Sequence, residues 1–276
     1  MINRRWSFNT MKKQIPNIFT LLNLFFGCIA IVFALQTENI SIYTNDEYSS
    51  SFNIPESISY AALFLFAAAI VDFLDGFVAR LFNASSDMGK QLDSLADVVS
   101  FGVAPGVILY QLLRMSYMRE ETGLDTSVLF LFPAFIYSCA AAYRLAKFNL
   151  DNSQAYGFKG LPTPAAGLLV ASFPLILHYG SGFKDINVWL TDNVNDWLIS
   201  KWVLYAIILL LSWLMVSNLP LMALKFKDFK VKNNRPIILL AAIAIISAIA
   251  LQWWAVPIIF IAYIILSLAL KNKTTS

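Results

Sequence analysis

The chain carries little charge for its length. Only 13% of its 276 residues are Asp, Glu, Lys or Arg, about half the share in an average soluble domain. Histidine occurs once and cysteine twice, and Cys28 and Cys139 both lie inside apolar runs. We therefore expect the two cysteines to be small packing residues, and not a disulfide or a metal site. The scarcity of charge excludes an ordinary soluble globular protein, and no nucleic-acid partner is expected.

Long apolar runs fill most of the chain, since 58% of it is hydrophobic. A helix needs roughly 20 apolar residues to cross a bilayer. Runs of that length predict spans at Ile15–Leu35, Tyr60–Phe82, Leu92–Leu113, Val128–Leu150, Leu161–Tyr179 and Trp202–Leu224. The longer tail, Pro236–Leu270, is interrupted at Gln252–Trp254 and is predicted to form two short spans with the tryptophans at the membrane interface. We expect an all-α polytopic membrane protein with about eight transmembrane helices, in a single domain over residues 1–276.

Lysine and arginine are distributed unevenly between the predicted loops. If the N-terminus is cytoplasmic, only four of the 20 basic residues fall outside the membrane, namely Arg114, Arg119, Lys184 and Lys201. Cytoplasmic loops carry an excess of Lys and Arg, so both termini are predicted to be cytoplasmic. A seven-span chain would move the C-terminal lysines outside and fits less well.

Four aspartates stand where two of the apolar runs meet. Residues 72–80 read D-F-L-D-G-F-V-A-R, and residues 89–97 read G-K-Q-L-D-S-L-A-D. A carboxylate at the edge of a bilayer core is costly and needs a partner. We call these four residues the aspartate tetrad: Asp72, Asp75, Asp93 and Asp97.

Helical spacing predicts that the tetrad gathers at one place. Asp72 and Asp75 lie within an arc of about 100° on one helix, and Asp93 and Asp97 recur every four residues on the next. The two helices are antiparallel neighbours, with Ser85 or Ser86 as a candidate N-cap of the second. Four carboxylates on two rigid helices suit Mg²⁺ or Mn²⁺, which prefer oxygen ligands.

Small residues accompany the tetrad. Gly76 and Ala79 remove side-chain bulk beside the predicted metal site and leave room for a large ligand group. A plainer interpretation is that the acids are structural and pair with Arg80 and Lys90. Two further alternatives are an ion transporter, in which intramembrane acids line a pathway, and a catalytically silent lipid-binding scaffold. The absence of acids deep in the other predicted spans argues against transport.

The spacing D-x-x-D-G-x-x-A-R, eight residues, then G-x-x-x-D-x-x-x-D resembles the signature of the CDP-alcohol phosphotransferase family. All eight signature positions match: Asp72, Asp75, Gly76, Ala79, Arg80, Gly89, Asp93 and Asp97. The resemblance implies a membrane enzyme that transfers a substituted phosphate from a CDP-linked donor to an alcohol and releases CMP. It implies that the tetrad holds divalent metal at the donor diphosphate, that Asp97 is also the general base, and that the chain forms a homodimer. The donor is then expected to contact the four remaining signature residues: Gly76, Ala79, Arg80 and Gly89.

Three further segments resemble the bacterial phosphatidylserine synthases within that family. They are I-P-N-I-F-T-L-L-N-L-F-F-G at residues 15–27, S-F-G-V-A-P-G at 100–106, and R-L-A-K-F-N at 144–149 followed by G-F-K-G-L-P-T-P-A-A at 157–166. The resemblance implies CDP-diacylglycerol and L-serine as substrates, and an active site on the cytoplasmic face of the inner membrane. Glycerol 3-phosphate and inositol remain alternative acceptors, because enzymes that use them share the core signature.

Three basic residues in the last of these segments are candidates for binding substrate. Arg144 offers a bidentate fork for a carboxylate or phosphate, and Lys147 offers a point charge at the same helix end. Lys159 lies in a glycine-flanked loop that is able to close over the site. The alternative is that Arg144 and Lys147 are cytoplasmic anchors, which is the commoner role of such residues.

Overall fold

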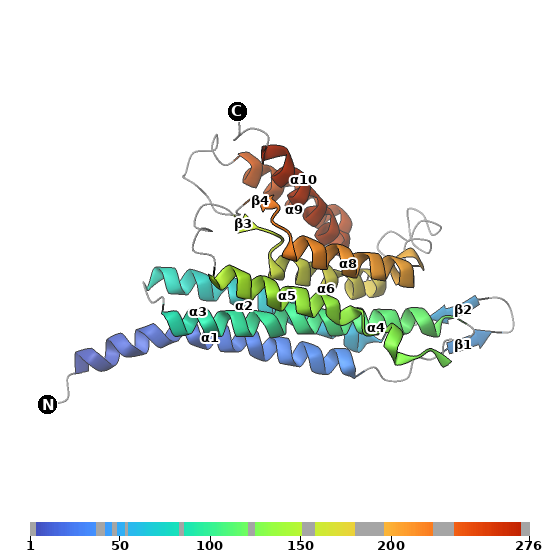
Figure 1. The fold of residues 1–276 in the computed structure, drawn as a ribbon, viewed down its shortest axis with the longest axis horizontal. Helices are drawn as coiled ribbons and strands as arrows, with labels where there is room; N and C mark the ends of the chain where they lie inside the picture. The colour runs from blue at the N-terminus through green and yellow to red at the C-terminus, as the bar shows by residue number, and fades with distance from the viewer. Residues whose placement is uncertain are drawn as a thin grey trace.

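The structure is an elongated helical bundle (Figure 1). It is a computed structural model and describes residues 4–36, 42–45, 49–52, 55–82, 86–120, 125–150, 158–179, 196–222 and 235–271. The first half contains α1 (Arg4–Leu35), α2 (Glu56–Leu81), α3 (Asp87–Asp97) and α4 (Ala104–Met118), with a π-helical turn at Val98–Val103 that joins α3 to α4. The second half contains α5 (Ala134–Leu150), α6 (Thr163–Tyr179), α8 (Lys201–Val216), α9 (Arg235–Leu251) and α10 (Ala255–Lys271). The expected all-α architecture is confirmed.

Short extended segments accompany the helices. β1 (Ile42–Asn45) pairs antiparallel with β2 (Ser49–Phe52) in the connection between α1 and α2. β3 (Phe158–Lys159) pairs antiparallel with β4 (Pro220–Leu221), so that the segment before α6 is bonded to the segment after α8. In Figure 1 the first pair lies at the end of the bundle away from the N-terminus, and the second lies beside α9 and α10.

Four helical stretches are long and apolar enough to cross a membrane: Ile15–Leu35, Glu56–Leu81, Asp87–Met118 and Arg235–Ala269. Thr163–Tyr179 and Lys201–Val216 are shorter apolar helices. The predicted break in the tail is confirmed, because a 3₁₀ turn at Gln252–Trp254 separates α9 from α10 and the two helices pack against each other. The length and apolar composition of these helices indicate an integral membrane protein.

Two predicted spans have the wrong bounds. The fourth was expected to start at Val128, but Val128–Phe130 form a 3₁₀ turn and α5 starts only after Pro133. The sixth was expected to reach Leu224, but α8 ends at Val216. Pro220 has no backbone N–H to continue a helix, and the chain becomes extended there as β4. Hydropathy alone did not locate these ends, because the residues around them are also apolar.

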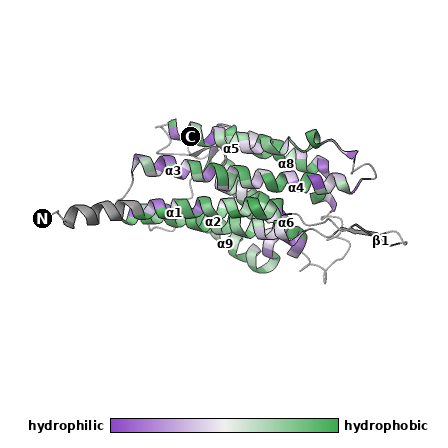
Figure 2. Ribbon diagram, turned by 90° about the horizontal axis from the view of Figure 1, so that it is seen from below, coloured by the Kyte–Doolittle hydropathy of each residue, from purple (hydrophilic) through white to green (hydrophobic). Residues whose placement is uncertain are grey.

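The outward face of the bundle is apolar. Figure 2 shows hydrophobic residues along the helices and hydrophilic ones mainly toward their ends. Cys28 and Cys139 are free and exposed on this surface, so the expectation that they pack inside the protein is wrong. Lipid tails accept the same apolar side chains as a protein interior does, and an apolar run therefore does not reveal which of its residues face inward.

Close helix contacts fix the π-helical turn against its neighbours. The Ser100 hydroxyl donates to the carbonyl oxygen of Asn23 on α1 at 3.0 Å. From α5, the Tyr137 hydroxyl donates to the Phe101 carbonyl at 3.0 Å. The Ser138 hydroxyl donates to the Gly102 carbonyl at 2.9 Å. These bonds hold the turn between α1 and α5, directly after the last aspartate of the tetrad.

Candidate active site

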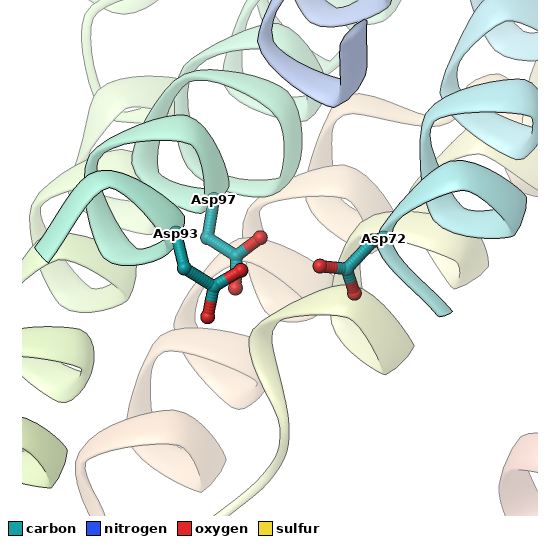
Figure 3. A group of neighbouring side chains, drawn as sticks. All are labelled: Asp72, Asp93 and Asp97. Carbon is teal, nitrogen blue, oxygen red and sulfur yellow. The ribbon is translucent and has the colours of Figure 1, made fainter. Parts of the chain in front are cut away.

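Three carboxylates of the tetrad converge between two helices. Asp72 comes from α2, and Asp93 and Asp97 come from one face of α3, four residues apart. One oxygen from each of the three carboxylates lies within 4.8 Å of the others. Figure 3 shows Asp72 facing the other two across the gap between the helices. Asp97 is the most buried of the three, with 7% of its surface exposed.

The fourth aspartate is turned toward α1. Asp75 is buried and accepts a short hydrogen bond from the hydroxyl of Thr20. It remains close enough to Asp72 and Asp93 to interact with them electrostatically. The structure therefore brings the predicted tetrad together as three converging carboxylates and one carboxylate beside them.

A buried polar stripe on α1 supports the acids. Asn17, Thr20 and Asn23 recur every three residues and are each less than one-tenth exposed. The Asn23 side-chain amide donates to Asp97 at 3.3 Å, and its own oxygen is buried with no hydrogen-bond partner in the described part of the chain. The sequence interpretation missed this role, although polar residues at helical spacing inside an apolar run were a usable signal.

The donor set of the converging carboxylates fits a hard divalent cation. All three ligands are oxygens of Asp72, Asp93 and Asp97, and within the described residues none of them forms an ion pair with Lys or Arg. The guanidinium of Arg80 instead donates to the backbone oxygen of Gly76 at 2.8 Å. Arg144 interacts electrostatically with Asp97 without forming an ion pair. Three carboxylates this close are unfavourable without further positive charge. The plainer interpretation, in which Arg80 neutralises the acids, therefore does not describe this structure.

The two signature glycines have different surroundings. A Cβ atom on Gly76 would meet nothing within 4 Å, so the space beside it on α2 is open. A Cβ on Gly89 would lie 3.0 Å from Ser86 Oγ and 3.1 Å from Asn17 Oδ1. Ser86 is the N-cap of α3, because its hydroxyl accepts from the Gly89 N–H at 3.0 Å. Gly89 thus lets α3 approach α1 closely, while Gly76 leaves room for a ligand.

A cavity of about 330 Å³, which we call the side pocket, opens on one side of Asp93 and Asp97. Its polar lining comes from α3 and α5: Lys90, Asp93, Ser94, Asp97, Arg144 and Asn149. Its apolar lining includes the prolines before and within α6, and residues from the C-terminal part of the chain. The side pocket therefore places two basic side chains and one amide side chain next to Asp93 and Asp97.

Of the three basic residues predicted to bind substrate, Arg144 lines the side pocket. It is 7% exposed, its Nη1 donates to Thr163 Oγ1 at 2.8 Å, and its Nε is buried with no partner among the described residues. Lys147 does not line the side pocket and donates to Asn218 Oδ1 at 2.7 Å. Lys159 lies in β3, and its side chain is outside the described part of the structure. Lys90, which was considered only as an ion-pair partner, does line the side pocket.

Comparison with known proteins agrees with this site. Residues 13–214 match the family model described as CDP-alcohol phosphatidyltransferase. The chain belongs to this family. The matched region contains the whole tetrad, the α1 stripe and Arg144, so the resemblance identified from the signature is confirmed.

Several relatives of this chain are named CDP-diacylglycerol--serine O-phosphatidyltransferase. The protein of that name from Bacillus subtilis is 40% identical over 130 residues, which cover 45% of this chain and 68% of the relative. The protein from Helicobacter pylori strain 26695 is 32% identical over 83% of this chain and 78% of its own length. The protein from Mycobacterium tuberculosis H37Rv is 32% identical over 90% of this chain and 75% of its own length.

Proposed function

We propose that the chain transfers the phosphatidyl group of CDP-diacylglycerol to the hydroxyl of L-serine, and releases phosphatidylserine and CMP. The observation that carries the proposal is the convergence of Asp72, Asp93 and Asp97 beside a pocket that contains Arg144. The printed names of relatives that align over most of this chain support serine as the acceptor.

The donor is assigned to the carboxylate side of the site. Mg²⁺ or Mn²⁺ held by the tetrad would supply positive charge for the diphosphate and the departing CMP. Gly76, Ala79, Arg80 and Gly89 remain the proposed donor contacts, and the open space beside Gly76 suits a nucleotide. Thr20 restrains the Asp75 carboxylate, and Asn23 restrains that of Asp97, so the acids are held in place before the donor binds.

Asp97 is the proposed general base. Its carboxylate takes the proton of the serine hydroxyl while the hydroxyl oxygen forms a bond to the phosphorus that carries diacylglycerol. The bond from that phosphorus to the CMP oxygen breaks, and CMP leaves. Asp97 lines the side pocket, so one carboxylate faces both the metal ligands and the space assigned to the acceptor.

One assay distinguishes L-serine from the alternative acceptors. Purified wild-type protein in detergent receives CDP-diacylglycerol with L-serine, glycerol 3-phosphate or inositol in turn, and CMP and the lipid product are measured. We expect release of CMP with L-serine and little with the other two alcohols. Transfer to either of the others in place of serine would reassign the acceptor, and ion flux in liposomes without CMP release would favour the transporter.

Arg144→Ala is expected to raise the KM for L-serine by about tenfold or more, because the side pocket loses its buried guanidinium. If Arg144 binds the serine carboxylate, the KM for CDP-diacylglycerol should change less than the KM for L-serine. If Arg144 binds the lipid phosphate, the KM for CDP-diacylglycerol should change by as much or more. Lys147→Ala removes a cation from the same helix end but outside the side pocket, and should have a smaller effect. Wild-type kinetics of Arg144→Ala would remove Arg144 from the site.

The finer placement in the membrane is also a proposal. We infer eight crossings by a single domain, with both termini and the tetrad on the cytoplasmic side of the inner membrane. The helix ends at the side pocket support alternating crossings in the second half, because α5 ends there, α6 begins there, and Met222, which follows α8, also lines it. Several of the lysines behind the orientation, including Lys225 and Lys273, lie outside the described residues. The family resemblance supports a homodimer.

A further inference from the structure

The side pocket is completed by residues beyond the region that the family model matches. That region ends at residue 214. Met222, which directly follows β4, and Tyr263 of α10 both line the side pocket. Tyr263 is 5% exposed. One wall beside Asp97 and Arg144 is therefore built by the C-terminal part of the chain, outside the region that matches the family model.

Hydrogen bonds lock this wall in position. The Tyr263 hydroxyl donates to the carbonyl oxygen of Met222 at 3.0 Å. The Met222 N–H donates to Ser267 Oγ at 3.1 Å, and Ser267 in turn donates to the Tyr263 carbonyl at 2.7 Å. Both polar backbone groups of Met222 are thus held by α10, and the ring of Tyr263 has little freedom to swing away.

The same contacts extend to the segment that leads into α6. β4 pairs with β3, and the Gly160 N–H donates to the Leu219 carbonyl at 2.8 Å. Gly160 has φ +78°, and a Cβ there would meet the carbonyl oxygens of Met215 and Ser217 at 2.7 Å, so this crossing requires glycine. Pro162, two residues after Gly160, lines the side pocket. α10 therefore supports a second wall through β4 and β3.

We propose that Tyr263 is a specificity-determining residue whose ring limits the length of the acceptor that the side pocket admits beside Asp97. The proposal rests on the proposed function. Arg144 Nε, a buried donor with no hydrogen-bond partner among the described residues, sets where an acceptor carboxylate sits. The acceptor carboxylate is then fixed at Arg144, and the Tyr263 ring is held by Met222 and Ser267. An amino acid that is one methylene longer therefore does not fit with its hydroxyl at Asp97.

The test compares acceptors on three variants of the full chain. L-serine is compared with L-homoserine, which has one more methylene, at a fixed concentration of CDP-diacylglycerol. Tyr263→Ala is expected to raise the ratio of kcat/KM for L-homoserine over L-serine by about tenfold, since a methylene in a pocket discriminates by about that factor. Tyr263→Phe retains the ring but loses its hydrogen bond to the Met222 carbonyl, and should give a ratio between those of wild type and Tyr263→Ala. Tyr143→Ala removes the same side chain from the exposed face of α5 and should leave the ratio unchanged.

The outcomes separate the two proposals. A wild-type protein that uses another alcohol but not serine overturns the proposed function. A wild-type protein that uses serine, with a Tyr263→Ala variant that keeps the wild-type ratio, overturns only the role of Tyr263. Loss of serine transfer in Tyr263→Ala with no relative gain for L-homoserine indicates a purely structural wall and also overturns it. Where the alanine variant fails to fold, Tyr263→Leu retains apolar bulk with less reach and gives the same comparison.

Discussion

Asp97→Asn is expected to lower the rate of CMP release by about a thousandfold or more, and to leave CDP-diacylglycerol bound. Asparagine has the same shape as aspartate but does not accept the proton of an attacking hydroxyl, and loss of a general base costs roughly 10²–10⁴ in rate. Asp97 is also one of the three converging carboxylates, so its replacement weakens the cation site at the same time. Both effects lower turnover, while Asp72 and Asp93 remain to hold a cation at the donor.

Turnover is measured as CMP release with saturating L-serine, and donor binding is measured separately with labelled CDP-diacylglycerol. Asp87→Asn is the matched control, because Asp87 lies in the first exposed turn of the same helix and outside the converging group. It should retain nearly full activity. Near-normal CMP release from Asp97→Asn would rule out the proposed base.

Removal of divalent cations is expected to abolish turnover reversibly. Three carboxylate oxygens within 4.8 Å of one another repel strongly unless a cation lies among them. Activity lost in EDTA should return with Mg²⁺ or Mn²⁺, and the midpoint of thermal unfolding should rise when either ion is added, because a ligand that binds only the folded state stabilises it.

Asp72→Ala tests whether the cation binds at the converging carboxylates. It removes the only converging carboxylate contributed by α2, and should reduce or eliminate the thermal shift caused by the metal. Asp87→Ala should retain the full shift. A wild-type protein that is fully active in EDTA, with no thermal response to either cation, would contradict a metal role for the tetrad.

The chemistry of the site was more predictable than its supporting structure. Fixed helical spacing was sufficient to bring Asp93 and Asp97 onto one face, because the geometry of a helix is local. The direction taken by Asp75 was not predictable in this way, since it depends on a hydroxyl of α1 that lies 55 positions away in sequence. The spacing therefore identified the four acids. Only the packing of α1 showed that three of them converge and that Asp75 turns toward Thr20.

The basic residues illustrate the same limit. Arg144 and Lys147 are three residues apart on one helix, and sequence patterns gave them the same role. In the structure Arg144 is enclosed beside Thr163, while Lys147 reaches Asn218 after α8. The contribution of Tyr263 was also hidden from the sequence, because α10 reaches the side pocket only through packing between distant parts of the chain. Side-chain partners that come from remote segments decide these differences.

The π-helical turn at Val98–Val103 makes the junction of α3 and α4 intolerant of insertions and deletions during evolution. Such a turn accommodates one more residue than an α-helical turn, and each residue of a helix rotates the chain by about 100°. A single-residue insertion or deletion there would turn Asp93 and Asp97 relative to α4, which lies against α5 where Gly106 closely approaches Ser138. Homologous sequences are therefore expected to be free of gaps between the last aspartate and Pro105, even where their loops differ widely in length.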